Sequence, residues 1–129
     1  MVLLTFKVFK EKIESGEKTQ TIRMFSSIHQ WMRLRNAKIF HLYWHNPRNG
    51  GKLIKVVEPS EQPFMIAFNN SDQCSNIDII GESKDRIIDL NAFAQRDGFA
   101  SSKEMFDWFF NEYGSRMYQE KFIVMRWKP

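Results

Sequence analysis

The stretch Ser15-Gly16-Glu17-Lys18-Thr19-Gln20-Thr21-Ile22-Arg23 leads from a predicted helix into a predicted strand. Phe9 and Ile13 give the preceding segment, residues 7–15, an apolar stripe at helical spacing, and the glycine fits the left-handed position that follows a helix. The threonines and the isoleucine favour an extended chain over residues 18–23. We therefore expect a short helix, a glycine stop and a strand in direct succession.

Short apolar runs and turn residues predict that much of the remaining chain is β structure. The cluster Asn46-Pro47-Arg48-Asn49-Gly50-Gly51 lies between two alternating runs and predicts a hairpin. The other expected strands are residues 2–6, 38–44, 52–57, 64–68, 77–80 and 121–127, with residues 86–88 left open as a further one.

Capping residues and helical periodicity predict further helices. Ser26 or Ser27 caps a helix that runs to about Arg35. Its expected apolar side consists of Ile28, Trp31, Met32 and Leu34. A brief helical turn covers residues 91–96. Ser101 and Glu104 form a capping box for a helix over residues 101–113, whose expected buried side consists of Met105, Trp108 and Phe109.

These elements together predict one α+β domain over residues 1–129. We expect an antiparallel sheet that curls into a small barrel with flanking helices. The chain has 129 residues, of which 43% are hydrophobic and 15% aromatic, so it can form one core and is not a disordered chain. No repeat or linker divides the sequence into two units.

Basic residues are concentrated in the first half of the chain. Residues 1–58 carry 11 Lys and Arg against 4 Glu, or +7, whereas residues 59–129 carry 8 against 11 acidic residues, or −3. A surface polarised in this way can attract the phosphate backbone of a nucleic acid, and the simpler alternative is a solvated basic face.

The sequence argues against several other classes of protein. No apolar run reaches the roughly 18 residues of a membrane-spanning helix and no signal peptide is present, so we expect a cytoplasmic protein with no membrane partner. Cys74 is the single cysteine, which excludes an intramolecular disulfide. His41 and His45 lie about 13 Å apart on an extended strand, too far to share one metal. We expect neither a metal nor a cofactor.

The polar residues of the stretch 15–23 are the best candidates for a site. On a regular strand Thr19, Thr21 and Arg23 share one face and can present two hydroxyls and a planar cation to a phosphate or a nucleobase. Lys18 falls on the opposite face unless the glycine turn leaves it outside the pleat, where it can turn toward Thr21. The simpler interpretation is an edge strand whose lysine and threonine side chains are solvated.

Three segments of the sequence match a family pattern. They are Lys18-Thr19-x-Thr21-x-Arg23 after Gly16, the run Ala94-Gln95-Arg96-Asp97-Gly98-Phe99 followed by Ser102-Lys103-Glu104-Met105-Phe106-Asp107-Trp108-Phe109, and Phe122-Ile123-Val124-Met125-Arg126-Trp127. Together they span nearly the whole chain and resemble the ASCH (activating-signal-cointegrator homology) domain family. The resemblance implies a PUA-like small β-barrel with helices packed against it, and a function directed at RNA or modified nucleosides.

The resemblance extends to small bacterial amidohydrolases that remove the acetyl group from N4-acetylcytidine. Lys18 and Thr21 correspond to their catalytic lysine and threonine, and Asp97 falls at the position of their catalytic glutamate. A threonine hydroxyl needs a neighbouring base to attack an amide, and a lysine can serve once its pKa is lowered. Aspartate is one methylene shorter than glutamate, which moves the carboxylate by roughly 1.5 Å. The pair Asp97-Gly98 also fits a turn that ends a helix.

Two other functions remain open from the sequence: a non-catalytic RNA-binding ASCH module and a ribonuclease. RNA binding would use polar, basic and aromatic side chains, for which the candidates are Thr19, Arg23, Arg33, Arg35, Trp44 and Lys52. Each tryptophan is expected in the core, and an exposed one beside Lys18 would indicate base stacking.

Overall fold

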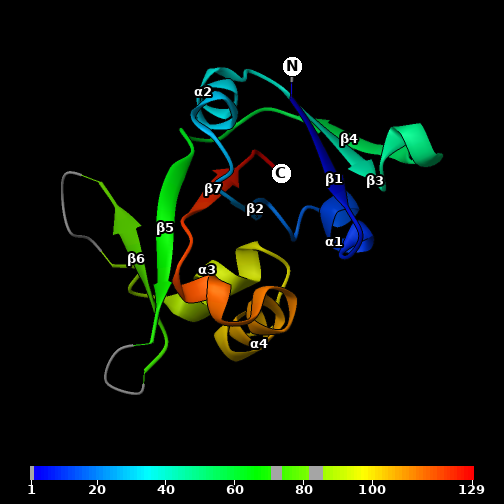
Figure 1. Ribbon diagram of the computed structural model, residues 1–129. Coiled ribbons are helices and arrows are strands. Elements are labelled where there is room, and N and C mark those ends of the chain that lie inside the picture. Colours follow the sequence, from blue (N-terminus) through cyan, green and yellow to red (C-terminus); the bar gives the residue numbers. More distant parts are fainter. Residues whose placement is uncertain (1, 71–73, 82–85) are drawn as a thin grey trace.

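A computed structural model describes residues 2–70, 74–81 and 86–129 of the chain (Figure 1). The strands are β1 (Val2–Phe6), β2 (Gln20–Met24), β3 (Phe40–Trp44), β4 (Lys52–Val57), β5 (Phe64–Asn69), β6 (Asn76–Ile80) and β7 (Phe122–Arg126). The helices are α1 (Lys10–Ser15), α2 (Ile28–Asn36), α3 (Leu90–Arg96) and α4 (Ser102–Tyr113), and the short 3-10 turns are η1 (Pro47–Asn49) and η3 (Gly114–Tyr118).

The strands form two sheets in the described part of the chain. One has the order β1-β3-β4, with β1 parallel to β3 and β3 antiparallel to β4. The other has the order β2-β7-β5-β6 and is antiparallel throughout. An isolated bridge between Pro59 and Trp127 joins the segments that leave β4 and β7. The α+β class and the predicted hairpin are confirmed, whereas the pairing of these described strands does not close a barrel.

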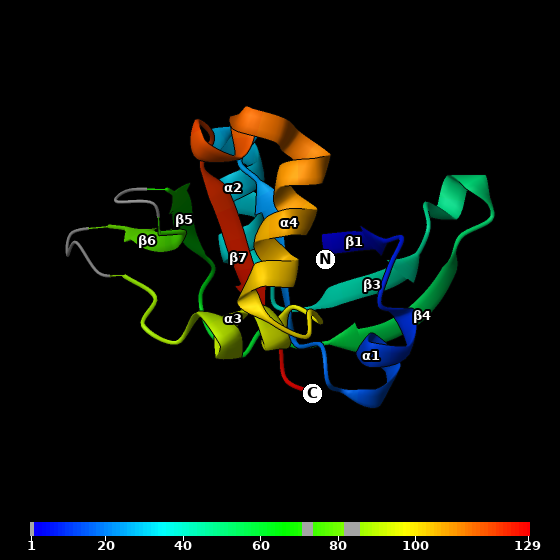
Figure 2. The same cartoon turned by 90° about the horizontal axis from the view of Figure 1, so that it is seen from below.

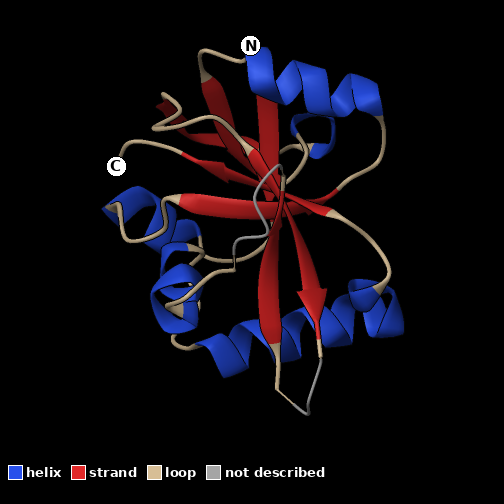
Figure 3. Cartoon of the chain, turned by 90° about the vertical axis from the view of Figure 1, so that its left-hand side faces the viewer, coloured by secondary structure: helices blue, strands red, loops and turns tan. Residues whose placement is uncertain are grey.

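Strand β7 is central to the fold because both of its faces are buried. Phe122 and Val124 pack into a core that includes residues of α3, α4 and β5. Ile123 and Met125 pack into a second core that includes residues of β1, β3 and α1. Successive side chains of a strand point to opposite faces, so one strand serves both cores. Figures 2 and 3 show the strands in the middle of the molecule with helices on more than one side of them.

The helix and the strand on either side of Lys18 both begin later in the chain than the sequence predicts. Helix α1 starts at Lys10 rather than at residue 7, because Phe9 takes a left-handed conformation with φ 66°. Gly16 has φ 87° after the helix, as predicted. Strand β2 starts at Gln20 rather than at residue 18, so Lys18 precedes the strand.

Helix α2 covers the predicted residues and buries part of the predicted apolar side. Ser27 caps it by accepting a hydrogen bond from the Gln30 amide. Leu34 is buried, but Ile28 and Met32 are 60% and 46% exposed. Trp31 and Leu34 of the predicted apolar side pack against the second core. The prediction was wrong for Ile28 and Met32, because only a narrow stripe of α2 meets the core.

The C-terminal helices follow the sequence prediction closely. The Ser101 hydroxyl caps α4 by accepting from the Glu104 amide. The Glu104 carboxylate accepts from the Ala100 amide, one residue earlier than in a standard capping box. Residues 86–88 form one isolated bridge to Asp78 and no strand.

Gly98 packs against Phe9 and connects the turn after α3 to the start of α1. Gly98 has φ 104°, and a Cβ built on it would lie 2.9 Å from the Phe9 ring. Gly98→Ala should therefore lower the free energy of unfolding by about 1–3 kcal/mol, measured by denaturant titration. Gly81→Ala is the matched control, because a Cβ there meets nothing within 4 Å. Equal stability of the two variants would contradict this packing.

Candidate functional site

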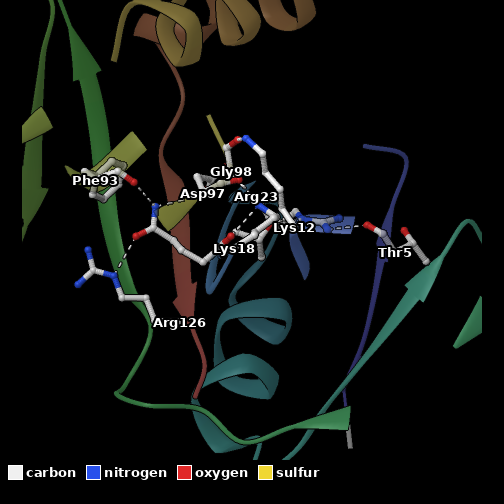
Figure 4. A network of polar contacts seen from close by, with 10 residues as sticks. Thr5, Lys12, Lys18, Arg23, Phe93, Asp97, Gly98 and Arg126 are labelled. Atoms are coloured by element: carbon white, nitrogen blue, oxygen red, sulfur yellow. Dashed lines mark hydrogen bonds and ion pairs between the residues drawn. The ribbon is translucent and has the colours of Figure 1, made fainter. Parts of the chain in front are cut away.

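A pocket of about 260 Å³ lies between β1, β2 and α4. β1 and β2 are the outer strands of their sheets, and the pocket occupies the space between them. The polar side chains in its lining are those of Thr5, Lys7, Lys18, Thr21, Arg23, Asp97, Glu112 and Tyr113. Lys18, Thr21 and Arg23 therefore lie at the same pocket as Asp97, which comes from the end of α3. Figure 4 shows the contact of Lys18 with Asp97 and the hydrogen bond from Arg23 to Thr5.

Lys18 is buried in the pocket lining, with 2% of its surface exposed. Its place before β2 puts it outside the pleat, which was one of the two alternatives left open by the sequence. Its Nζ donates to the carbonyl oxygens of Gln20 at 2.7 Å and of Asp97 at 2.5 Å. The centroids of the Phe6 and Phe9 rings each lie 5.6 Å from Nζ. These contacts fix the Lys18 amine in one position.

Asp97 ends α3 and also lines the pocket. Its amide donates to the Ala94 carbonyl as the helix closes, and Gly98 turns the chain away with φ 104°. The buried carboxylate has Oδ2 at 3.4 Å from Lys18 Nζ, while Oδ1 accepts from Gln20 Nε2 at 3.3 Å. Asp97 therefore both ends the helix, as the turn interpretation predicted, and lines the pocket.

Thr21 and Arg23 share one face of β2 and both line the pocket. Arg23 Nε donates to Thr21 Oγ1 at 3.2 Å, and Arg23 Nη2 donates to the Thr5 carbonyl at 2.6 Å. The guanidinium also lies 4.9 Å from the centroid of the Phe6 ring. Arg23 thus spans the space from β2 to β1. Because Thr21 Oγ1 accepts this bond, its own proton remains available for a base.

Burial moves both members of the Lys18–Asp97 pair toward their neutral forms. Desolvation is the largest influence on each, lowering the pKa of Lys18 and raising the pKa of Asp97. The charge of each residue opposes the shift of its partner, while Arg23 lowers the pKa of both. The energy gap between the charged pair and the neutral pair is therefore reduced.

Aromatic side chains make up much of the remaining wall. Phe6 and Phe9 come from β1 and the turn after it, and Trp108, Phe109 and Tyr113 come from α4. Phe109 is buried as predicted, but Trp108 is 37% exposed, so the prediction that it belongs to the buried side was wrong. Its position at the pocket leaves part of the ring open to a ligand. Planar walls with a few convergent polar groups are typical of sites for ring-shaped ligands.

Gln20 is the main residue that the sequence analysis missed. Its fully buried side chain donates from Nε2 to Asp97 Oδ1 and to the Phe93 carbonyl, and accepts at Oε1 from Arg126 Nε. Gln20 and Arg126 are direct partners in the β2–β7 register. Nothing in the local sequence Thr19-Gln20-Thr21 indicates that the glutamine is buried. Its partner Arg126 follows only from the register of β2 against β7.

The other predicted binding residues lie outside the pocket lining. Thr19 is half-buried just before β2, and Arg33 and Arg35 are exposed in the last turn of α2. Trp44 packs against the second core and is opposite Lys52 across the β3–β4 pair. Any contact that these five residues make with RNA would be separate from the pocket.

Comparison of the chain with family models, with curated proteins and with solved structures finds no match. Within residues 2–70, 74–81 and 86–129, no helix combines the length and hydropathy needed to cross a bilayer. In the same ranges, no three His, Cys, Asp or Glu side chains are arranged to hold a metal ion.

The Lys18–Asp97 pair should behave as one energetic unit. Removing one partner leaves the other charged group buried and unpaired. Lys18→Met and Asp97→Asn should therefore each lower the free energy of unfolding by about 3 kcal/mol. The double variant should lose less than the sum of the two, by at least about 1 kcal/mol, in a denaturant-unfolding cycle. Strictly additive losses would show that the two side chains are not coupled.

The stability of Asp97→Asn should depend on pH in a direction set by Lys18. The variant loses the charge that raises the pKa of Lys18, so burial lowers that pKa further. Between this folded pKa and the higher pKa of the unfolded chain, the unfolded state binds more protons. Stability should therefore rise with pH through this window, and the rise should be missing when Lys18→Met is added. A rise of equal size in both variants would assign the effect to another group.

Proposed function

We propose that this protein hydrolyses the amide of an acylated cytidine, of the N4-acetylcytidine type, in the pocket between β1, β2 and α4. The observation that carries the proposal is the convergence of Lys18, Thr21, Arg23 and Asp97 on one pocket with aromatic walls. The resemblance of the surrounding motifs to ASCH amidohydrolases supports the same residues.

We also propose a PUA-like relationship for the fold. Its support is that the two sheets meet at two places: the bridge from Pro59 to Trp127, and the hydrogen bond from Arg23 to the Thr5 carbonyl. The second core lies between these places and contains residues of both sheets. The pocket then lies between β1 and β2, which are connected by the Arg23 side chain and not by backbone hydrogen bonds.

A planar base fits the division of the pocket into apolar and polar parts. The rings of Trp108 and Tyr113 line the pocket, and the 37% exposed Trp108 offers a surface on which a base can stack. The polar groups of Lys18 and Asp97 are buried, so only a group that enters the pocket can reach them. An exocyclic amide on a pyrimidine is such a group.

In the first step Thr21 Oγ1 attacks the acyl carbon and passes its proton to the neutral amine of Lys18. A neutral amine keeps two N–H groups, enough for the two short bonds to the carbonyls of Gln20 and Asp97. The reacting form is the neutral pair, in which the Lys18 proton has moved to the Asp97 carboxyl; burial favours this transfer because it lowers the pKa of Lys18 and raises that of Asp97. Arg23 contacts Thr21 and faces the oxyanion that develops there.

In the second step the C–N bond breaks and Asp97 gives its proton to the leaving exocyclic nitrogen. This releases cytidine and leaves the acyl group as an ester on Thr21. Water then attacks the ester, its proton goes to the Asp97 carboxylate, and the Lys18 ammonium returns a proton to Thr21. One water is consumed, one carboxylic acid is formed, and the pair regains its starting protonation.

Thr21→Val should lower the rate of N4-acetylcytidine hydrolysis by more than about 100-fold, because the nucleophile is lost. Cytidine formation followed by chromatography measures the rate. Thr19→Val is the matched control: it makes the same chemical change two residues away and outside the pocket lining, so its rate should equal that of the natural sequence. Full activity of Thr21→Val, or loss of activity in both variants, would refute the assignment.

The kcat/KM for hydrolysis should follow a bell-shaped pH profile, since the active pair shares one proton. Burial places the acid limb above the ordinary pKa of aspartate and the basic limb below that of lysine. Asp97→Asn removes the internal proton acceptor, so the remaining activity should rise with pH as Lys18 loses its proton to solvent. An unchanged acid limb in this variant would exclude Asp97 from the reaction.

RNA binding without catalysis is the second candidate, and the exposed Arg33 and Arg35 on α2 favour it. Arg33→Gln with Arg35→Gln should weaken RNA binding in a gel shift and reduce the slope of log K against log salt by about one per lost phosphate contact. Lys103→Gln on α4 is the control. Steep salt dependence with no turnover of acylated cytidine would favour this function, and cleavage of the RNA would favour the ribonuclease.

A further inference from the structure

Arg126 and Gln20 form a polar chain that reaches Asp97 from outside the pocket. Arg126 Nε donates to Gln20 Oε1 at 2.9 Å, and Arg126 Nη1 donates to Glu61 Oε1 at 2.9 Å. The guanidinium lies 5.1 Å and 5.8 Å from the ring centroids of Phe64 and Phe93. In Figure 4, Arg126 lies on the opposite side of Asp97 from Arg23 and Thr5. Arg126 is thus fixed by an acid, an amide and two rings.

This contact decides which way the Gln20 amide points. An arginine side chain has only donors, so the Gln20 atom that faces it is the carbonyl oxygen. The amide nitrogen then faces Asp97 and Phe93, where its two N–H groups meet Asp97 Oδ1 at 3.3 Å and the Phe93 carbonyl at 3.2 Å. The reversed amide would set an oxygen against two other oxygens. Arg126 therefore selects the single orientation in which every polar atom of Gln20 is paired.

The orientation of Gln20 acts on the Asp97 carboxyl. Donation to Oδ1 favours the carboxylate and leaves Oδ2 for Lys18. The charged groups around the Asp97 carboxyl include Lys18 and Arg23 near β2, Lys12 of α1 on the Gly98 carbonyl, and the Arg126–Glu61 pair behind Gln20. Lys7 and Glu112 also line the pocket. Gln20 is the only neutral donor among the described side chains that contacts the Asp97 carboxyl.

We infer that Arg126, acting through Gln20, is a positioning residue that holds Asp97 as an oriented acceptor and directs Oδ2 to Lys18. Neither Arg126 nor Gln20 lines the pocket. The role of the shared proton rests on the proposed function. In that function, Arg126 and Gln20 control the position of the proton from outside the substrate site. Burial raises the pKa of Asp97, and the hydrogen bond donated by Gln20 lowers it, which makes the proton easier to release to the leaving nitrogen.

The test is a carbon-13 NMR titration of the Asp97 carboxyl, which needs no substrate. Gln20→Met removes the donor, so the pKa of Asp97 should rise by about one unit, the size expected for losing a hydrogen bond to an ionised group. Gln20→Glu should raise it further, since two adjacent carboxylates share one proton. Arg126→Met should also raise it because the amide can then turn, and Arg126→Lys, which again offers only donors, should restore most of the natural value.

Lys128→Met is the matched control for charge. It removes one positive charge from the residues after β7, where Lys128 pairs with Glu58 and not with Gln20. An Asp97 titration that is unchanged in folded Arg126→Met, or shifted equally by Lys128→Met, overturns the inference. If the buried Gln20 variants fail to fold, the Arg126 variants decide, because the Arg126 side chain is partly exposed. If the Asp97 titration shifts as expected but the protein does not hydrolyse acylated cytidine, the proposed function is refuted and the inference about Arg126 stands.

Discussion

The contact between the Lys18 amine and Asp97 is the interaction on which the site depends. Two buried charges are stabilising only when their hydrogen-bonding capacity is met, and here the carbonyls of Gln20 and Asp97 and the amide of Gln20 meet it. The contact joins the start of β2 to the end of α3, elements 79 residues apart in the chain. The contact between Phe9 and the Cβ-free Gly98 packs the start of α1 against the same turn after α3.

The same contact links stability to the proposed chemistry. A buried lysine and a buried carboxyl are moved toward neutrality, which is costly for folding but suits groups that exchange a proton during a reaction. Arg23 has a comparable double role, since it closes the gap between β1 and β2 and places a cation beside the Thr21 hydroxyl. The buried polar side chains of the described residues therefore lie close to the edge strands β1 and β2, which do not pair with each other.

Local sequence patterns were enough to predict most elements and part of the site. The turn at 46–51, the glycine stop at Gly16 and the cap at Ser101 each depend on neighbouring residues, and all three are present. Lys18, Thr21, Arg23 and Asp97 were proposed from spacing and resemblance, and the structure places them at one pocket.

Features that depend on distant contacts could not be predicted. The exposure of Trp108 depends on the space left between α4 and β1, and the partner of Gln20 depends on the register of β2 against β7. Strand alternation placed Lys18 on the wrong face unless the turn released it, because β2 begins two residues later than the apolar pattern suggests. The incomplete closure of the sheets likewise reflects pairing between strands that no local pattern encodes.

The most direct test of the central claim is a titration of the isotope-labelled protein with cytidine, the product of the proposed reaction, followed by NMR of backbone amides and side chains. The account predicts that the largest shift changes occur at Lys18, Thr21 and the Trp108 indole, with α2 and the β3–β4 hairpin unaffected. Changes confined to Arg33, Arg35 and Lys52, or no change at Lys18 under saturating cytidine, would contradict it.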